Sequence, residues 1–225
     1  LLECKYNIGR VVQVYNRLYR MLSMKIEKKQ IRDIIRLGNS IIFFWLYIPH
    51  LFIMLLNKTK RGYVFSDAQR QKTKISITVT SNYLLFLYLL HNNRYFRSVF
   101  YYRIGAINSL LFGWWRPGDK YFQISFNTKV GKGFKVVHPY ATVINAKSIG
   151  DNFSCLHCTT LGAKGDKKPI VGNNVSLGAH VLIIGGVSIG NNVIVGAGAV
   201  VVKDLPDNCV AVGNPAKPIK FIETK

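Results

Sequence analysis

The sequence predicts an α+β protein in which a helical N-terminal domain is followed by a parallel β-helix. Three observations predict this architecture: an unbroken six-residue repeat from Val171 to Val201, a looser repeat over residues 130–161, and a change in composition near Pro117. Before Pro117 the sequence is strongly basic and poor in glycine. After it, glycine is abundant and lysine is the only strongly basic residue type.

The N-terminal domain is expected to span residues 1–117 and to consist of helices. The first 120 residues carry 20 of the 31 Lys and Arg residues but only 5 of the 10 acidic residues. Apolar residues at helical spacing predict a helix from about Ile8 to Leu37, and a further apolar run covers residues 83–90. The pair Pro117-Gly118 is typical of a turn, and we place the domain boundary there.

The apolar run of residues 41–56 leaves two interpretations open. It has 16 residues and contains Pro49, whereas a membrane-spanning helix needs about 20 apolar residues, so we disfavour a simple span. The run is therefore either a buried helix of the N-terminal domain or a segment embedded in one membrane leaflet. In the second case Trp45, Tyr47 and the flanking cations would form an interfacial anchor.

The net charge of +21 is compatible with binding to nucleic acid, with contact to an anionic lipid surface, or with a surface exposed to solvent. Aromatic and basic residues alternate between Asn92 and Gly105, a pattern that stacks bases in some nucleic-acid-binding proteins. No RRM, KH, zinc-finger or helix-turn-helix signature accompanies it, so we expect no nucleic-acid partner. We expect the charge to face solvent, an anionic leaflet or the phosphates of a cofactor.

From residue 171 onward, the first residue of every hexad is aliphatic, and Gly or another small residue usually follows. The aliphatic residues are Val171, Leu177, Ile183, Ile189, Val195 and Val201. Neither a helix of about 3.6 residues per turn nor a simple alternating strand gives this pattern. A period of six is typical of a parallel β-helix, in which short strands stack and bury one aliphatic side chain per face. We expect this domain to span residues 118–225.

The repeat continues backwards with two interruptions. Val130 and Val136 are in register with each other, and the residues of a second run, Ile149, Cys155 and Leu161, are in register among themselves. One extra residue separates these two runs, and four extra residues lie in the stretch 162–170. Insertions of this kind are expected at the corners of the coils, where they commonly line the working face.

Several motifs of this region occur together in one known family. They are His138-Pro139, then IGDN, TTLGAKG, VGNNVSLGAHV and VGAGAVVVKDLPDNCVAVGNPAKPI. Over roughly residues 122–222 the chain resembles the serine acetyltransferase-like hexapeptide acyltransferases. The resemblance implies a left-handed β-helix with three hexads per coil, a homotrimer, and acetyl-CoA bound along the seam between subunits.

Three hexads per coil would place four third-position residues one above another. These are His138, His157, Ala179 and Ala197. Because adjacent strands lie about 4.8 Å apart, the four residues should form a vertical column. The alanines would leave a smooth groove for a long, thin cofactor arm, and the histidines would lie where its reactive thioester ends.

The resemblance implies that His138 is the catalytic base. Histidine titrates near pH 6.5, so it can accept a hydroxyl proton and deliver it to a thiolate leaving group, which contributes roughly 10²–10⁴-fold to the rate. His157 is expected to support this base or bind the acceptor. The resemblance also implies cofactor contacts, and we assign them to Gly162, Ala179, Ala197, Lys203 and Lys217.

The chain departs from the serine acetyltransferase pattern in two places. The family has an Asp that orients the catalytic histidine, but the corresponding stretch here, residues 122–127, contains no carboxylate. Gln123, Ser125 or a backbone carbonyl would have to hold the ring instead. The family also has a His beside a Pro in its inserted loop, where this chain has Lys168 before Pro169. Both changes disfavour free L-serine as the acceptor.

Three functions therefore remain. The departures favour a branch of the family linked to capsule and lipopolysaccharide, and so an acetyl-CoA-dependent O-acetyltransferase acting on a sugar or a cell-surface polysaccharide precursor. The alternatives are a serine O-acetyltransferase of cysteine biosynthesis and a non-catalytic β-helix scaffold.

The four cysteines suggest neither a metal site nor a redox site. They are Cys4, Cys155, Cys158 and Cys209. A structural zinc site needs about four ligands, and no second CxxC pair is present. Cys155 falls on an inward aliphatic position, where a buried thiol packs as a small hydrophobe. Scattered cysteines without a secretory leader indicate a cytoplasmic protein, at the inner face of the membrane if residues 41–56 are embedded. Because the sequence begins at Leu1 without Met, we expect residues upstream.

Overall fold

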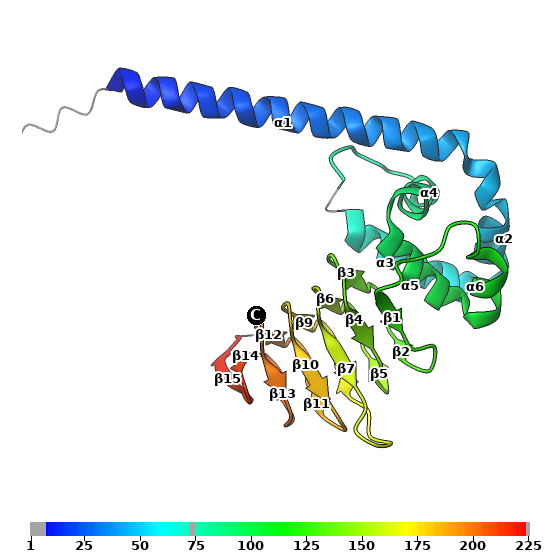
Figure 1. Ribbon diagram of the computed structural model, residues 1–225, viewed down its shortest axis with the longest axis vertical. Coiled ribbons are helices and arrows are strands. Elements are labelled where there is room, and N and C mark those ends of the chain that lie inside the picture. The colour runs from blue at the N-terminus through cyan, green and yellow to red at the C-terminus, as the bar shows by residue number, and fades with distance from the viewer. Residues whose placement is uncertain (1–7, 73–74, 224–225) are drawn as a thin grey trace, which may run out of the picture.

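The computed structural model describes residues 8–72 and 75–223, which form a helical region and a β-helix (Figure 1). The helical region contains α1 (Ile8–Ile42), the 3₁₀ helix η1 (Phe44–Tyr47), α2 (Ile48–Leu56), α3 (Lys58–Gln71), α4 (Asn82–Asn92), α5 (Arg94–Ile104) and α6 (Ala106–Phe112). Helices α2 to α6 gather at one end of the β-helix, and α1 extends away from them.

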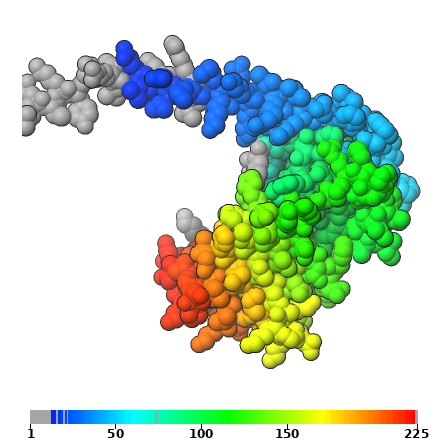
Figure 2. Space-filling model, in the orientation of Figure 1, coloured from blue at the N-terminus to red at the C-terminus, as the bar shows by residue number. Residues whose placement is uncertain are grey.

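The first helix begins where the sequence predicts but continues past Leu37 to Ile42. Its last turn is held in place because the Ser40 hydroxyl donates to the Arg36 carbonyl, at 2.7 Å, and accepts from the Asn92 amide. Much of the rest of α1 projects from the body as an arm (Figure 2). The predicted apolar residues Val14, Tyr15 and Leu18 are each more than half exposed along this arm.

The core of the helical region combines aliphatic and aromatic side chains. Helix α4, which matches the predicted run of residues 83–90, is buried from Leu85 to Leu90 because other helices surround it on several sides. The rings of Phe86 and Phe100 meet edge to face at 5.2 Å.

Residues 41–56 have one buried face, as expected for a helix of the core, and one exposed apolar face, as expected for a membrane-embedded segment. One face enters the core through Tyr47, His50 and Met54, each at most 1% exposed. The opposite face is open, and Trp45 and Phe52 are more than half exposed there. Within the described residues, no single helix is long and apolar enough to cross a membrane. Two consecutive helical segments, residues 13–42 and residues 44–56, are together long and apolar enough to cross one, but the chain bends by 68° between them.

The β-helix has three parallel sheets. The five-stranded sheet contains β1 (Phe122–Ile124), β4 (Thr142–Ile144), β7 (Thr160–Gly162), β10 (Leu182–Ile184) and β13 (Val200–Val201). The four-stranded sheet contains β2 (Lys129–Val130), β5 (Ser148–Ile149), β8 (Ile170–Val171) and β11 (Ser188–Ile189). The six-stranded sheet contains β3 (Lys135–Val136), β6 (Ser154–Cys155), β9 (Ser176–Leu177), β12 (Ile194–Val195), β14 (Cys209–Gly213) and β15 (Ala216–Phe221). Among the strands of the described residues, β14 and β15 alone pair antiparallel, in a hairpin that closes the last coil.

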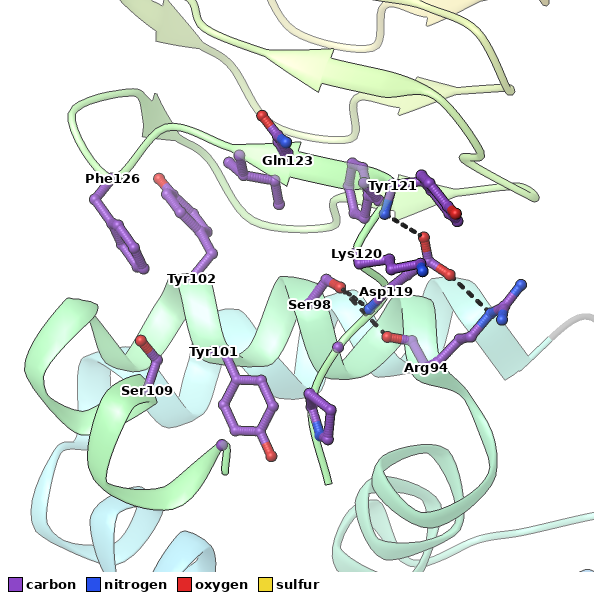
Figure 3. Close-up of a pocket in the computed structure, with 15 residues that line it drawn as sticks. Arg94, Ser98, Tyr101, Tyr102, Ser109, Asp119, Lys120, Tyr121, Gln123 and Phe126 are labelled. Carbon is purple, nitrogen blue, oxygen red and sulfur yellow. Dashed lines mark hydrogen bonds and ion pairs between the residues drawn. The ribbon is translucent and has the colours of Figure 1, made fainter. Parts of the chain in front are cut away.

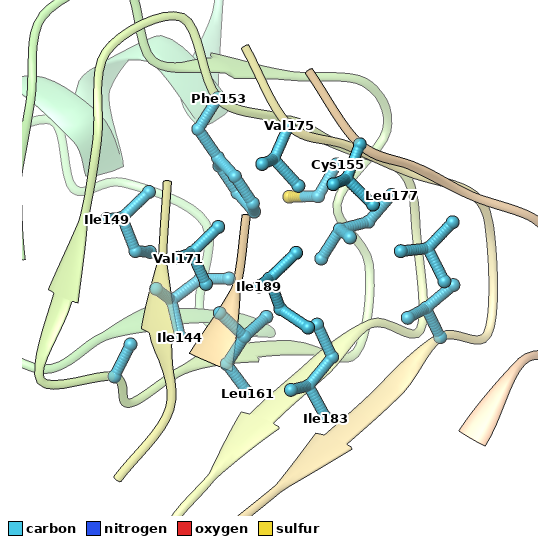
Figure 4. Close-up of a cluster of buried hydrophobic side chains, with 14 of the residues drawn as sticks. Ile144, Ile149, Phe153, Cys155, Leu161, Val171, Val175, Leu177, Ile183 and Ile189 are labelled. Carbon is cyan, nitrogen blue, oxygen red and sulfur yellow. The ribbon is translucent and has the colours of Figure 1, made fainter. Parts of the chain in front are cut away.

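The aliphatic residues predicted to point inward form the core of the β-helix (Figure 4). None of those between Val171 and Val201 is more than 3% exposed. Cys155 is fully buried among them, and this burial raises the pKa of its thiol to about 12. The predicted α+β class, with a helical region before a left-handed hexapeptide β-helix, is therefore confirmed.

The two predicted interruptions are both present, although the first is divided. Val136, Ile144 and Ile149 are consecutive inward residues, which are usually six positions apart. Here Ile144 follows Val136 by eight positions, and Ile149 follows Ile144 by five. The net gain is the one predicted residue. The longer segment forms the corner at residues 138–141, where His138 and Ala141 both have positive φ. The four-residue insertion forms a loop in which Lys164 and Lys167 pair.

A buried ion pair joins the helices to the first coil. Arg103 of α5 contacts Asp67 of α3 through Nε, at 2.8 Å, and through Nη2, at 3.2 Å. Arg103 also donates to the carbonyls of Val130 and Gly131, and Asp67 accepts the backbone N–H of Phe134 at 2.7 Å. The pair thus fixes α3 and α5 against the coil that leads into His138.

Candidate active site

The strand register stacks the four residues of the predicted column. Val136 pairs with Cys155, Cys155 with Leu177, and Leu177 with Val195. Two residues beyond these lie His138, His157, Ala179 and Ala197. Backbone hydrogen bonds continue the stack, since His157 O accepts from His180 N at 3.0 Å and Ala179 O accepts from Gly198 N at 2.8 Å.

In the upper part of the column Ala197 is exposed and Ala179 is half-buried. A glycine precedes each alanine because the coils approach closely there. A Cβ on Gly178 would lie 2.6 Å from Ala197 N, and a Cβ on Gly196 would lie 2.7 Å from Val212 Cγ1. The upper part of the column therefore presents backbone and small methyl groups at its surface.

His138 occupies a corner that differs from those above it. Its φ is +50°, whereas in the next coils the left-handed residue is one position later, at Cys158 and His180. His138 is exposed, and Pro139 after it is buried. The ring of Tyr95, from α5, meets the His138 ring edge to face at 6.4 Å. The side chain thus faces the helical region.

A cavity of about 420 Å³ lies beside His138, between the β-helix corner and helices α1, α3, α4 and α5. Gln71, the last residue of α3, lines it and is 2% exposed. Its Nε2 donates to Val136 O at 3.2 Å, two residues before His138, and its Oε1 has no hydrogen-bond partner among the described residues. A ligand hydroxyl donating to Gln71 Oε1 would therefore be close to the corner that carries His138.

His157 lies one coil above His138. Its ring meets the ring of His180 edge to face at 5.5 Å. His157 is half-buried, and the exposed His180 lies one coil above it, next to Ala179.

The other predicted site residues follow a second row, on the five-stranded sheet. Ser125 lies one residue beyond the partly buried Ile124, the last residue of β1, and Gly162 is the last residue of β7. Lys203 lies two residues after β13. Gln123 lines a cavity of about 640 Å³ under α5 and α6, whose lining residues do not include His138 (Figure 3). The roles predicted for Gln123 and Ser125 in orienting His138 stay predictions.

Lys217 lies near the upper end of the column. It pairs with Val212 across the β14–β15 hairpin, and Val195 pairs with Ala211 of the same strand. The hairpin thus continues the stack above Ala197 and places an exposed lysine beside it. Lys168 is half-buried in the inserted loop, and the carbonyl of the following Pro169 accepts from Lys147 N at 2.8 Å.

Comparison with known proteins agrees with this fold. Residues 168–203 match the family described as bacterial transferase hexapeptide (six repeats). The chain is 42% identical over 106 residues to the putative colanic acid biosynthesis acetyltransferase WcaB of Escherichia coli K12, covering 45% of this chain and 65% of that protein. It is 41% identical over 100 residues to serine acetyltransferase 4 of Arabidopsis thaliana, covering 42% of this chain and 28% of that protein.

A solved structure extends the likeness beyond the repeat. The crystal structure of Neisseria gonorrhoeae serine acetyltransferase (CysE) matches with a TM-score of 0.59 and 26% identity, over 75% of this chain and 69% of that chain. The match therefore covers more of this chain than the sequence relatives do. Taken together, the hexapeptide register, the closing hairpin and these matches show that residues 168–203 carry the repeat of the bacterial transferase hexapeptide family and that the chain is similar to serine acetyltransferases and to WcaB.

Proposed function

We propose that the protein is an acetyl-CoA-dependent O-acetyltransferase, with His138 as general base and a sugar or cell-surface polysaccharide precursor as acceptor. The observation that carries the proposal is the column of His138, His157, Ala179 and Ala197, in which two histidines lie one above the other and two alanines lie above them. The relatives named acetyltransferases support it.

In the proposed reaction an imidazole nitrogen of His138 takes the proton of the acceptor hydroxyl. The hydroxyl oxygen attacks the thioester carbonyl carbon, the carbon–sulfur bond breaks, and His138 returns the proton to the CoA thiolate. The products are the acetyl ester and free CoA. Tyr95 limits the orientation of the His138 ring by edge-to-face contact, as the missing carboxylate would otherwise do.

A homotrimer would reconcile the two rows of predicted site residues. Within one chain, the row of Ser125 and Gly162 belongs to the five-stranded sheet, whereas the column of His138 follows strands of the six-stranded sheet. A seam between neighbouring subunits would bring one subunit's row against the next subunit's column. CoA in that seam would pass Ala179 and Ala197, and Lys203 and Lys217 would face its phosphates.

The groove prediction can be tested by filling the column. Ala179→Trp and Ala197→Trp should each abolish measurable CoA binding in calorimetry, because the indole would occupy the path of the cofactor arm. The melting temperature should stay within about 2 °C of wild type, since surface changes outside the core cost little. Unchanged CoA affinity in both variants would show that the cofactor binds elsewhere.

A serine O-acetyltransferase is the second candidate, and the serine acetyltransferases among the relatives favour it. Release of CoA thiol from acetyl-CoA should be compared with L-serine and with a panel of sugars, free and phosphorylated. The first candidate expects turnover with a sugar and none with L-serine. The reverse result would identify the second. No thiol release with any acceptor would favour a non-catalytic scaffold.

We further propose that the helical region contacts the inner face of the cell membrane. Large apolar side chains are exposed together on the outer faces of η1, α2 and α6, and they are Phe44, Trp45, Ile48, Phe52, Leu55, Leu56, Ile107, Leu110 and Leu111. The buried contact of His50 with Phe112 holds α2 and the end of α6 side by side. Such a surface suits an interfacial anchor, and the basic residues nearby would add about 1 kcal/mol each at an anionic leaflet.

This contact predicts that wild-type protein sediments with membranes and requires detergent for release. High salt should release little, because salt screens charge but does not weaken apolar burial. Changing Phe44, Trp45, Phe52 and Leu55 together to Ser should shift the protein to the supernatant with its fold intact, since all four are exposed. The matched change of Val202 and Ile219 to Ser, on exposed β-helix positions, should not. Wild-type protein that stays in the supernatant without detergent would refute the contact.

A further inference from the structure

The cavity beside His138 is lined by an excess of positive charge. Lys29, Arg32 and Arg36 reach it from α1, and Arg94 reaches it from the start of α5. Among the described residues that line it, Asp33 is the only acidic one. A cavity that contains the expected catalytic base therefore also contains four cations, supplied by helices outside the repeat.

Asp33 offsets at most one of these four positive charges, and its oxygens also accept three hydrogen bonds. It accepts from the backbone N–H of Ser76 at 2.9 Å, from the Ser76 hydroxyl at 2.6 Å and from the Tyr88 hydroxyl at 3.0 Å. Burial disfavours its charge, but these hydrogen bonds prevail and hold the pKa of Asp33 below its ordinary value. Asp33 thus anchors α1 to the segment at residue 76 and to α4.

The four cations differ in how far they are already paired. Arg94 contacts Asp119 at 2.8 Å, and Arg36 lies 3.8 Å from Asp33. Lys29 and Arg32 lie on the same side of α1, and neither has a carboxylate within ion-pair distance among the described residues. These two side chains are therefore free to bind an anion at the mouth of the cavity.

Gln71 supplies a different kind of contact at the inner end. Its buried Oε1 lacks a partner, and leaving a buried acceptor unpaired costs about 1–3 kcal/mol. The amide orientation is fixed, since Nε2 is used by Val136 O. Because Oε1 can only accept, the group that satisfies it must donate, as a sugar hydroxyl does.

We infer that the acceptor is a phosphorylated sugar, whose phosphate binds Lys29 and Arg32 of α1 while its reacting end lies between Gln71 and His138. The inference rests on the proposed function and names its substrate class. Phosphate suits this site because an Arg fork binds it bidentately and a Lys adds a point charge. The volume of about 420 Å³ falls within the usual range of small-molecule sites. Free L-serine, small and with no net charge, would leave the cations unused.

The sugar phosphate has two possible sources, nucleotide-linked or lipid-linked, and the test includes both. Thiol release from acetyl-CoA is measured with UDP-N-acetylglucosamine in solution, with polyprenyl-diphosphate-N-acetylglucosamine in phosphatidylcholine vesicles, and with free N-acetylglucosamine. At least one phosphorylated arm should exceed the free sugar in kcat/KM by about tenfold or more, as expected for one charge-assisted contact.

Variants then locate the phosphate. Lys29→Gln with Arg32→Gln should raise KM for the preferred acceptor about tenfold or more, and should weaken binding of inorganic pyrophosphate in calorimetry, with CoA affinity unchanged. Arg32→Lys should recover part of the loss. The matched control, Arg17→Gln with Lys25→Gln, removes the same charge from the same helix and should change neither value. Gln71→Met should lower kcat/KM without altering pyrophosphate binding.

The outcomes separate this inference from the proposed function. Equal kcat/KM for free and phosphorylated sugars, with no effect of the Lys29 and Arg32 changes, would overturn the inference while the acetyltransferase stands. Loss of pyrophosphate binding in the control variant as well would show general attraction to a basic surface, and would also overturn it. Absence of thiol release in all arms would refute the proposed function, and pyrophosphate binding would still report on the cation site.

Discussion

Replacing His138 with Ala is expected to lower acetyl transfer by roughly 10²–10⁴-fold, the usual contribution of a general base. Its effect should fall on kcat, because the imidazole acts on the proton that moves in the transition state. CoA affinity should be unchanged, since the proposed CoA path runs along the coils above, past Ala179 and Ala197. Thiol release at saturating acetyl-CoA is the measurement.

The backbone at His138 requires a second variant. With φ at +50°, this position suits His or Asn better than Ala, so His138→Ala carries some backbone strain of its own. His138→Asn tolerates the conformation but cannot act as the base. Both variants should therefore lose activity, and His138→Asn should melt at the wild-type temperature. Activity of His138→Asn within about tenfold of wild type would reject His138 as the base.

The largest expected effect on stability comes from the buried ion pair. Arg103→Met should cost about 3–5 kcal/mol of unfolding free energy, because it leaves the Asp67 carboxylate buried without its partner. The Asp67 and Arg103 side chains are 1% and 6% exposed, so solvent cannot replace the lost contacts. Urea unfolding followed by circular dichroism measures the loss. A surface control, Arg17→Met, should stay within about 0.5 kcal/mol of wild type.

The same variant should have a characteristic pH dependence. Burial raises the pKa of Asp67 to about 6, against the pull of Arg103, and removing Arg103 raises it further. A carboxyl whose pKa is higher in the folded state stabilises the fold below its unfolded pKa, and this contribution is lost as pH rises through the folded pKa. Arg103→Met should therefore be less destabilised at pH 5 than at pH 7. Equal losses at both pH values would show that Asp67 is not charged in the wild-type protein.

The β-helix was predictable because the aliphatic residue at the first position of each hexad identifies the register of that hexad. An aliphatic residue every six positions places Val136, Cys155, Leu177 and Val195 in one stack, and the residues two positions later must stack with them. The corner at residues 138–141 was less predictable. A gain of two residues and a loss of one look, in the sequence, like a single insertion.

The surroundings of His138 could not be predicted in the same way. Gln71 and Tyr95 reach it from helices 67 and 43 residues earlier in the chain, and no repeat connects helical positions to the coils. The alternation of aromatic and basic residues between Asn92 and Gly105 was visible, but its periodicity does not show that Tyr95 meets the His138 ring. The role of Gln71 could not be predicted from the sequence, since only the folded structure shows that its amide oxygen is buried without a hydrogen-bond partner.

The run of residues 41–56 shows why its sequence left two interpretations open. Every residue type in it is suited either to a core or to a lipid leaflet, so composition alone does not choose. The structure divides the run by face, with Tyr47 and Met54 inward and Trp45 and Phe52 outward. The apolar composition predicted that the segment would be removed from water. The bend between α1 and α2 determines which of its side chains are buried in the protein core.

The most direct measurement is the mass of the acceptor after incubation with acetyl-CoA and the protein. We expect the phosphorylated sugar to gain one acetyl group as an alkali-labile ester, with the wild-type protein and not with His138→Asn. An acceptor that gains the group equally with both proteins, or never gains it while CoA binds along the column, would contradict an acetyltransferase site at His138.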